Sequence, residues 1–231
     1  MSSSPSSPAS NNRWSEAWEA GRTGWDLGGP TPALTALLAA PPAGVVLPDS
    51  GAALVPGCGA GYDVRALATA LPGLDVVGVD VAPLAKDAFD SRVNGGAERV
   101  ENAQVVLGDV FAVGSADAPK GVPDALQVAS KTALVYDYTF LCAIEPEDRA
   151  RWAALMARVL EPGRGRLVVL IFPTEEPGRG PPPYQIVPDD VEALLTPHGF
   201  ECEHLAPVPH DVTEAEWRKG KEVMSVWKLR A

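Results

Sequence analysis

The sequence predicts an α/β fold built on a doubly wound, seven-stranded sheet that is mostly parallel, with one antiparallel strand at its edge. Residues 52–80 read as a strand, a glycine-rich turn, a helix and a second strand. Further apolar runs of strand length alternate with helical segments, and two strand-like runs end the chain close together. Parallel neighbours need a helical crossover, whereas a late pair of strands can add an antiparallel strand to a parallel sheet.

Length and composition favour one globular domain. The chain has 231 residues, of which 46% are hydrophobic, so its core needs no disulfide support. Residues 1–12 are rich in Ser and Pro and lack an apolar block, so we expect a disordered tail rather than a signal segment, followed by a domain over 13–231.

Charge and cysteine content narrow the function classes. The net charge of −11 disfavours nucleic acid as a partner, because phosphate backbones are bound by Lys and Arg. No apolar run is long enough to span a bilayer. The three cysteines form no CxxC pair, which argues against a disulfide framework or a zinc site. We therefore expect a cytoplasmic monomer without a metal.

The first element of the domain is an N-terminal helix rich in tryptophan. Trp14 and Trp18 are four residues apart and share a helix face, and Trp25 follows a break at Gly21. The indoles either fasten an amphipathic helix to the core or form a lid whose aromatic faces lie against a cation. The glycine-rich motif downstream favours the lid.

The glycine-rich turn at Gly57, Gly59 and Gly61 predicts a nucleoside site. Glycine allows backbone conformations and a close ligand approach that a Cβ would block, and the turn falls at the carboxyl edge of the sheet, where such folds bind ligands. Asp80, at the end of the next strand, can accept both hydroxyls of a ribose. The alternative is a purely structural turn with a strand-end carboxylate. Tyr62 stands where a dinucleotide fingerprint requires glycine, which disfavours a dinucleotide.

The remaining elements follow in order. Apolar periodicity and proline or glycine boundaries predict helices over 33–38, 64–71, 84–93, 146–160 and 191–195, and strands over 104–107, 132–139, 165–173, 199–208 and 223–229. The polar segment 114–131 is interrupted by Gly and Pro, so we interpret it as a surface excursion.

Three polar side chains beyond the first turn are candidates for the same edge. Asp109 follows the third strand and either receives an adenine amino group or caps a turn. Tyr138 ends the fourth strand beside Asp137. Tyr184 lies in a loop over 174–190 that its prolines stiffen, and it either points its hydroxyl into a pocket or packs.

Several motifs together resemble one family. They run from Trp14 to Lys228 and read RWSEAWEAGRTGWDLGGPTP, LVPGCGAGYDV, VVGVDVA, GDVF, DYTFLCAIEPEDRARWA, GPPPY and RKGKEVMSVWK. They resemble the thiopurine methyltransferase family, most closely its plant and fungal thiol and halide methyltransferase branch. The resemblance implies a seven-stranded class I methyltransferase fold, with S-adenosylmethionine as methyl donor and S-adenosylhomocysteine as product.

The resemblance also implies roles for individual residues. Those expected around the cofactor are Trp14, Trp18 and Trp25 as a lid, Gly57 at its amino-acid portion, Gly59 in the same glycine-rich turn, Asp80 at the ribose, and Asp109 with Val110 at the adenine. Tyr138 is expected to contact cofactor or acceptor, and Tyr184 to orient the nucleophile. The loop has three prolines where the family usually shows two, which leaves the register of Tyr184 open by one residue.

The expected reaction is S-methylation of small thiols or hydrosulfide, with halide or thiocyanate as further acceptors. Transfer from a sulfonium is an in-line displacement that needs alignment and exclusion of water rather than a metal. Three alternatives stay open: a methyltransferase for a larger aromatic thiol or secondary metabolite, a non-catalytic S-adenosylmethionine-binding protein, and a nucleotide-dependent oxidoreductase.

Overall fold

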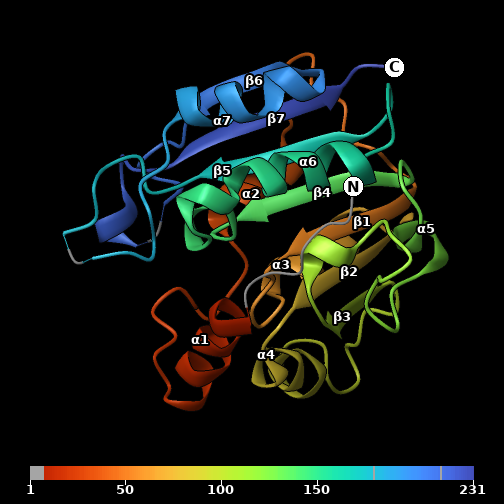
Figure 1. Cartoon of the computed structure of the whole chain (residues 1–231), viewed down its shortest axis with the longest axis vertical. Coiled ribbons are helices and arrows are strands. Elements are labelled where there is room, and N and C mark those ends of the chain that lie inside the picture. The colour runs from red at the N-terminus through yellow and green to blue at the C-terminus, as the bar shows by residue number, and fades with distance from the viewer. Residues whose placement is uncertain (1–7, 179, 214) are drawn as a thin grey trace.

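The computed structural model describes residues 8–178, 180–213 and 215–231, which form one seven-stranded sheet with helices on both faces (Figure 1). The strand order is β3-β2-β1-β4-β5-β7-β6. The strands are β1 (Gly51–Pro56), β2 (Leu74–Asp80), β3 (Ala103–Leu107), β4 (Thr132–Tyr138), β5 (Arg166–Ile171), β6 (Phe200–Pro207) and β7 (Val223–Leu229).

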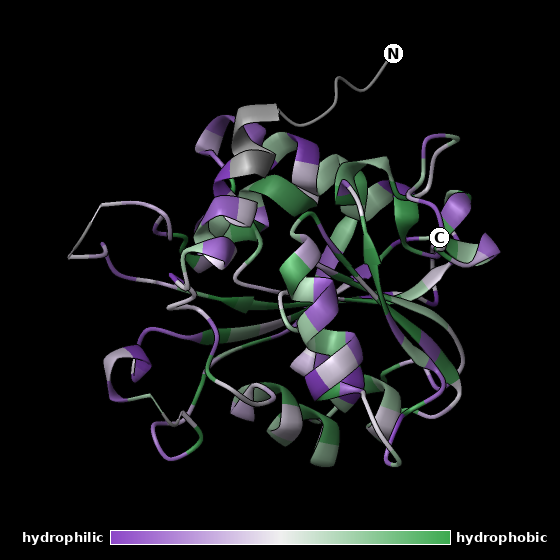
Figure 2. Cartoon of the chain, turned by 90° about the horizontal axis from the view of Figure 1, so that it is seen from below, coloured by the Kyte–Doolittle hydropathy of each residue, from purple (hydrophilic) through white to green (hydrophobic). Residues whose placement is uncertain are grey.

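Helices cover both faces of the sheet, as the predicted crossovers require. They are α1 (Pro8–Glu19), α2 (Pro32–Ala39), α3 (Tyr62–Ala70), α4 (Pro83–Ala88), α5 (Asp124–Gln127), α6 (Arg149–Val159) and α7 (Pro188–Leu195); α4 continues into a π-helical turn at Phe89–Val93. One core contains α5, α6 and α7, and the other contains α2 and α3. Figure 2 shows the hydrophobic strands crossing the molecule between these two layers.

Alternation along the strands assigns each side chain to one of the two cores. In β1, Leu54 packs into the core with α6, whereas Ala53 and Val55 pack into the core with α3. Successive strand residues point to opposite faces, so a strand covered on both sides is apolar throughout. The seven-stranded, doubly wound, mostly parallel sheet predicted from the sequence is thus confirmed.

The position of the antiparallel strand differs from the prediction. β7 pairs antiparallel with both β5 and β6, so it lies inside the sheet, and the edge strand is β6. Side-chain chemistry explains the order, because β7 contributes the buried Val226 and Trp227. By contrast, β6 carries the charged Glu201 and Glu203, which suit an edge exposed to water.

Two further expectations, the extent of the N-terminal tail and the exposure of segment 114–131, differ from the structure. Helix α1 begins at Pro8, so residues 8–12 are helical rather than part of a tail, while residues 1–7 lie outside the described residues. The segment 114–131 is more than a surface excursion, because Val122 and the fully buried Leu126 pack into the core. Its Pro119 lies so close to Gly108 that a Cβ on Gly108 would be 2.5 Å from the Pro119 Cβ.

Candidate active site

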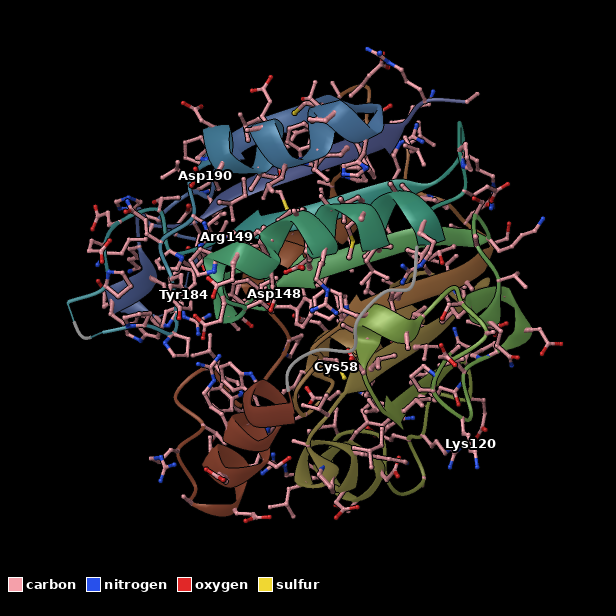
Figure 3. All side chains as sticks on the ribbon, in the orientation of Figure 1. Cys58, Lys120, Asp148, Arg149, Tyr184 and Asp190 are labelled. Carbon is pink, nitrogen blue, oxygen red and sulfur yellow. The ribbon has the colours of Figure 1, made fainter. Side chains whose placement is uncertain are left out.

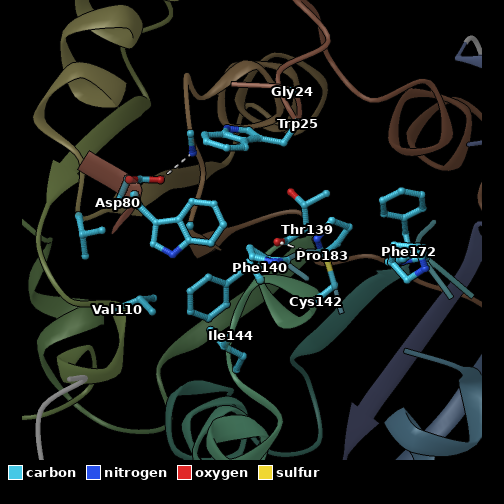
Figure 4. Close-up of a pocket in the computed structure, with 18 of the residues that line it drawn as sticks. Gly24, Trp25, Asp80, Val110, Thr139, Phe140, Cys142, Ile144, Phe172 and Pro183 are labelled. Carbon is cyan, nitrogen blue, oxygen red and sulfur yellow. Dashed lines mark hydrogen bonds between the residues drawn. The ribbon is translucent and has the colours of Figure 1, made fainter. Parts of the chain in front are cut away.

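A cavity of about 720 Å³ opens at the carboxyl edge of the sheet (Figure 4), within the size range of pockets that enclose small-molecule ligands. At one end its wall comes from the ends of β1, β2 and β3, at Gly57, Asp80 and Val110. At the other end it comes from Phe172, which follows β5, and from Arg218, in the connection between β6 and β7. The Trp-rich N-terminal segment also lines the cavity, and Figure 4 shows Trp25 beside Asp80.

The glycine-rich turn after β1 has a shape that other residues would disturb. Gly57 and Gly59 have φ values of +55° and +54°, in the region that favours glycine. A Cβ on Gly57 would lie 2.5 Å from Cδ2 of Phe140, so this position excludes a side chain sterically as well. A Cβ on Gly59 would come no closer than 3.9 Å to Trp18 and Trp25, so its backbone faces open space beneath the indoles.

Asp80 lies at the end of β2 and is fixed by two backbone amides. Its Oδ2 accepts a hydrogen bond from the Gly59 amide and its Oδ1 accepts one from the Ala82 amide, each at 2.9 Å. Burial raises the pKa of this carboxyl, and the two amide bonds partly oppose that shift. A carboxylate has about four lone-pair sites, so two remain for hydroxyl donors in the cavity, as a ribose diol would require.

The three predicted tryptophans are brought together. The ring centroids of Trp14 and Trp25 lie 5.2 Å apart, and those of Trp18 and Trp25 lie 6.2 Å apart, in edge-to-face arrangements. All three line the cavity. Their rings present both a negative π face, suited to a cation, and apolar surface that excludes water.

The turn after β3 contributes to the cavity wall at the same end as Asp80. Asp109 and Val110 both line the cavity, as the sequence predicts. The Asp109 side chain also caps the short helix Val110–Ala112 by accepting a hydrogen bond from the Phe111 amide at 3.0 Å. Asp109 therefore caps a turn, as one of the two interpretations of the sequence proposed, and it also lies in the cavity wall. Phe111, Phe140 and Ile144 complete an apolar surface next to it.

Tyr138 does not line the cavity. Its hydroxyl donates a hydrogen bond to Oε1 of Glu222 at 2.8 Å, and its ring borders a separate small pocket of about 70 Å³ beside Gly57. In this structure the hydroxyl is bonded to Glu222 rather than placed in the cavity wall, and its contact with cofactor or acceptor stays a prediction. The residue that follows it, Thr139, borders both spaces.

Tyr184, labelled in Figure 3, is also not among the residues that line the cavity. This hydroxyl donates to Oε2 of Glu145, and the Tyr184 amide donates to the Cys142 carbonyl at 2.7 Å. The preceding Pro183 lines the cavity instead. The hydrogen bond to Glu145 raises the pKa of Tyr184, which favours the protonated form. The predicted orienting role of its hydroxyl is not supported by this geometry.

Arg218 is a cavity residue that the sequence analysis missed. Its side chain is 1% exposed and its guanidinium lies over the rings of Tyr138, Phe172 and Trp217, at 5.3, 5.0 and 4.5 Å from their centroids. Nη2 donates to the Trp25 carbonyl at 3.3 Å, while Nε and Nη1 have no hydrogen-bond partner among the described residues. Burial lowers the pKa of Arg218, although an arginine stays charged near neutrality. Arg218 lies in the connection between β6 and β7, away from the end of any predicted strand, so the sequence pattern did not indicate it.

Two thiols lie close to the cavity. Cys142 lines it, and Cys58 borders the small pocket. Burial raises the pKa of both thiols well above the ordinary value. Since the thiolate is the nucleophile, both side chains are kept in their unreactive form.

The described residues offer neither a metal site nor a membrane-spanning helix. The described part of the chain contains no group of three or more His, Cys, Asp or Glu side chains placed to hold a metal ion. Nor does any helix within it have the length and apolar character needed to cross a membrane.

Comparison with known proteins agrees with this architecture. Residues 9–229 match the family model "Thiopurine S-methyltransferase (TPMT)". The probable thiol methyltransferase 2 of Arabidopsis thaliana is 38% identical over 219 residues, covering 95% of this chain and 85% of the relative. The thiocyanate methyltransferase 1 of the same plant is 36% identical over 215 residues, covering 93% and 83%.

A solved structure shares the fold. The 1,6-didemethyltoxoflavin-N1-methyltransferase of Burkholderia thailandensis, solved with its substrate and S-adenosylhomocysteine, superposes with a TM-score of 0.66 at 17% identity, covering 100% of this chain and 94% of that one. The architecture is therefore that of the class I S-adenosylmethionine-dependent methyltransferases. With the family match over almost its whole length, the chain belongs to the thiopurine S-methyltransferase family.

Proposed function

We propose that this protein transfers the methyl group of S-adenosylmethionine to the sulfur of a small anionic acceptor, such as a thiolate, hydrosulfide or thiocyanate, and that a halide can take the same place. The observation that carries the acceptor class is Arg218, a buried guanidinium in the cavity wall with two unpartnered nitrogens. The thiol and thiocyanate methyltransferases among the relatives support the same class.

The residues at one end of the cavity fit the cofactor. Asp80 has free lone pairs for the ribose hydroxyls, and the apolar surface beside Val110 suits an adenine ring. The open space over Gly59 admits a ligand directly against the backbone. The indoles of Trp14, Trp18 and Trp25 would then lie around the positive charge. When bound, the cofactor supplies an electrophilic methyl group on a sulfonium.

The residues at the other end fit an anion. Arg218 faces the part of the cavity beyond the predicted ribose and adenine positions, next to Phe172. Nε and Nη1 are buried behind the cavity surface, so the side chain would have to turn for them to donate to a negatively charged acceptor, while the surrounding aromatic rings exclude water. Such an arrangement holds the nucleophile in line and strips its hydration, which are the main requirements of this displacement. The hydroxyls of Tyr138 and Tyr184 are engaged elsewhere, so the acceptor would enter already deprotonated.

Replacing Arg218 tests this proposal. Arg218→Gln removes the charge, and because a hydrogen bond to a charged group contributes about 1.5–3 kcal/mol, KM for thiocyanate should rise roughly tenfold to a hundredfold. Arg218→Lys keeps the charge and should lose less. S-adenosylhomocysteine affinity, measured by calorimetry, should change much less than KM in both variants, since Arg218 reaches the cofactor end only through its bond to the Trp25 carbonyl. An unchanged KM would contradict the acceptor role, and an equal loss of S-adenosylhomocysteine affinity would assign Arg218 to the cofactor instead.

A second candidate is methylation of a larger aromatic thiol. Trp217 is 49% exposed, lines the cavity and packs edge-to-face on Phe172 with centroids 5.7 Å apart, so it offers an aromatic surface at the acceptor end. A larger acceptor stacked there would depend on Trp217 more than on Arg218. Comparing Trp217→Ala with Arg218→Gln on an aromatic thiol and on thiocyanate separates the two candidates.

A further inference from the structure

Three walls of the cavity are joined by one carboxylate, that of Glu145. Its Oε1 accepts a hydrogen bond from Nη1 of Arg13 at 3.1 Å, and its Oε2 accepts one from the Tyr184 hydroxyl. Arg13 lies on α1, Glu145 lies between β4 and α6, and Tyr184 lies between β5 and α7. We call these three residues the Glu145 cluster.

Each member of the Glu145 cluster is the chain neighbour of a residue in the cavity wall. Arg13 precedes Trp14, Glu145 follows Ile144, and Tyr184 follows Pro183, and these three neighbours all line the cavity. The cluster itself lies outside the cavity lining. We call α1, which carries Trp14 and Trp18, the Trp helix, and the residues that follow β4 at 139–145 the β4 edge. A contact within the cluster therefore fixes the Trp helix, the β4 edge and the proline-rich loop over 174–190 relative to one another, without taking up space in the cavity.

Further bonds fasten the cluster to the β4 edge. Nη2 of Arg13 donates to the Ala143 carbonyl at 3.3 Å, and the Tyr184 amide donates to the Cys142 carbonyl at 2.7 Å. Among residues 13–19 of α1, Arg13 provides the side-chain hydrogen bonds to the rest of the described chain. Arg13 also stacks its guanidinium on Trp14, 5.2 Å from the ring centroid. Movement of Trp14 away from the cavity would thus break the contacts of Arg13.

We propose that Glu145 is a positioning residue that holds the Trp helix and the proline-rich loop closed over the cofactor. The proposal rests on the function proposed above, because it takes the enclosed ligand to be that cofactor. Isolated surface ion pairs contribute little. The Arg13 and Glu145 side chains, however, are only 34% and 35% exposed. The Glu145 carboxylate also binds two distant parts of the chain, since Arg13 lies 132 residues before it and Tyr184 lies 39 residues after it. The Arg13–Glu145 bond must break before α1 moves away, and the Tyr184–Glu145 bond must break before the proline-rich loop does.

The first test needs no ligand. Amide hydrogen exchange of α1 is measured in the free full-length protein, in Glu145→Gln, and in Tyr184→Phe, which loses only the hydroxyl. Glu161→Gln is the matched control, since Glu161 also pairs with an arginine, Arg164 at 3.0 Å, with similar side-chain exposure, but this pair joins residues only three apart in sequence. We expect exchange over residues 8–19 to become roughly threefold to tenfold faster in Glu145→Gln, to change less in Tyr184→Phe, which keeps the Arg13–Glu145 pair, and to stay unchanged in the control.

The second test follows release of S-adenosylhomocysteine by stopped-flow tryptophan fluorescence. The dissociation rate constant should rise roughly threefold to tenfold in Glu145→Gln. Added salt should speed release from the wild-type protein, by screening the Arg13–Glu145 pair, and have less effect on the variant. Arg13→Gln combined with Glu145→Gln should give less than the sum of the two single effects.

The outcomes separate this proposal from the one on which it rests. Unchanged exchange in α1 together with unchanged release in Glu145→Gln would overturn the role of the Glu145 cluster. A wild-type protein that does not bind S-adenosylhomocysteine would overturn the proposed function. In that case the exchange of α1 alone decides whether the cluster holds the Trp helix in place.

Discussion

Asp80→Asn is the change that most sharply tests the cofactor end of the cavity. The carboxylate accepts two backbone amides at 2.9 Å, which leaves two lone-pair sites for the ribose hydroxyls. An asparagine has the same size but a single acceptor oxygen and two donor hydrogens. It can keep one amide bond, but it cannot also receive both hydroxyls.

The magnitude follows from the lost hydroxyl bond. A hydrogen bond to a charged group contributes about 1.5–3 kcal/mol, so the expected loss is roughly tenfold to a hundredfold in affinity. Isothermal titration calorimetry with S-adenosylhomocysteine measures this loss. The matched control is Asp75→Asn, an exposed aspartate on the same strand β2, for which we expect no change.

Fold integrity is checked by the thermal midpoint of each variant. If Asp80→Asn is folded and binds S-adenosylhomocysteine with an affinity close to that of the wild-type protein, Asp80 does not hold the ribose. The assignment of that end of the cavity would then be refuted. A loss shared equally by Asp75→Asn would show that the effect is not specific to the site.

Two further predictions concern stability. A Cβ at Gly57 would meet Phe140 at 2.5 Å, whereas one at Gly96, which also has a positive φ of +79°, would meet nothing within 4 Å. Gly57→Ala should therefore lower the free energy of unfolding by about 1–3 kcal/mol more than Gly96→Ala in urea titrations, and equal losses would contradict the packing argument. The buried Asp137 accepts hydrogen bonds from Trp152 and Leu141, and burial raises its pKa to about 6. The folded protein therefore holds this proton more tightly than the unfolded chain, so Asp137 should reduce the free energy of unfolding by about 3 kcal/mol as the pH rises from about 4 to above 6. Asp137→Asn should lack that part of the pH dependence, and identical slopes in the two proteins would contradict it.

The fold was predictable because its determinants are local. The glycine turn and the spacing of Val64, Leu67 and Ala68 define the first crossover within thirty or so residues. The order of the last two strands was not predictable, because the pairing of β5 with β7 depends on contacts between residues far apart in sequence. In the same way, Val122 and Leu126 are four residues apart in a polar segment, and only the folded core shows that both are buried.

The residues of the candidate site also fall into those predictable from local sequence and those that depend on distant contacts. The sequence placed the three tryptophans, Asp80 and Val110 at the cavity correctly, because each is adjacent to a recognisable strand end or helix. The direction of the Tyr138 hydroxyl depends on Glu222, which lies 84 residues later in the chain. The Tyr184 hydroxyl depends on Glu145 in the same way. Arg218 was missed because its cavity position is created by the rings packed around it.

The most direct test of the central claim is methyl transfer from S-adenosylmethionine to a panel of acceptors: hydrosulfide, a small alkyl thiol, an aromatic thiol, thiocyanate, iodide and chloride. The account predicts turnover on the small anionic acceptors, with kcat/KM for thiocyanate or hydrosulfide above that for the aromatic thiol. Turnover only on the aromatic thiol would place the larger acceptor at Trp217. Binding of S-adenosylmethionine without turnover on any acceptor would contradict the account and favour a non-catalytic role.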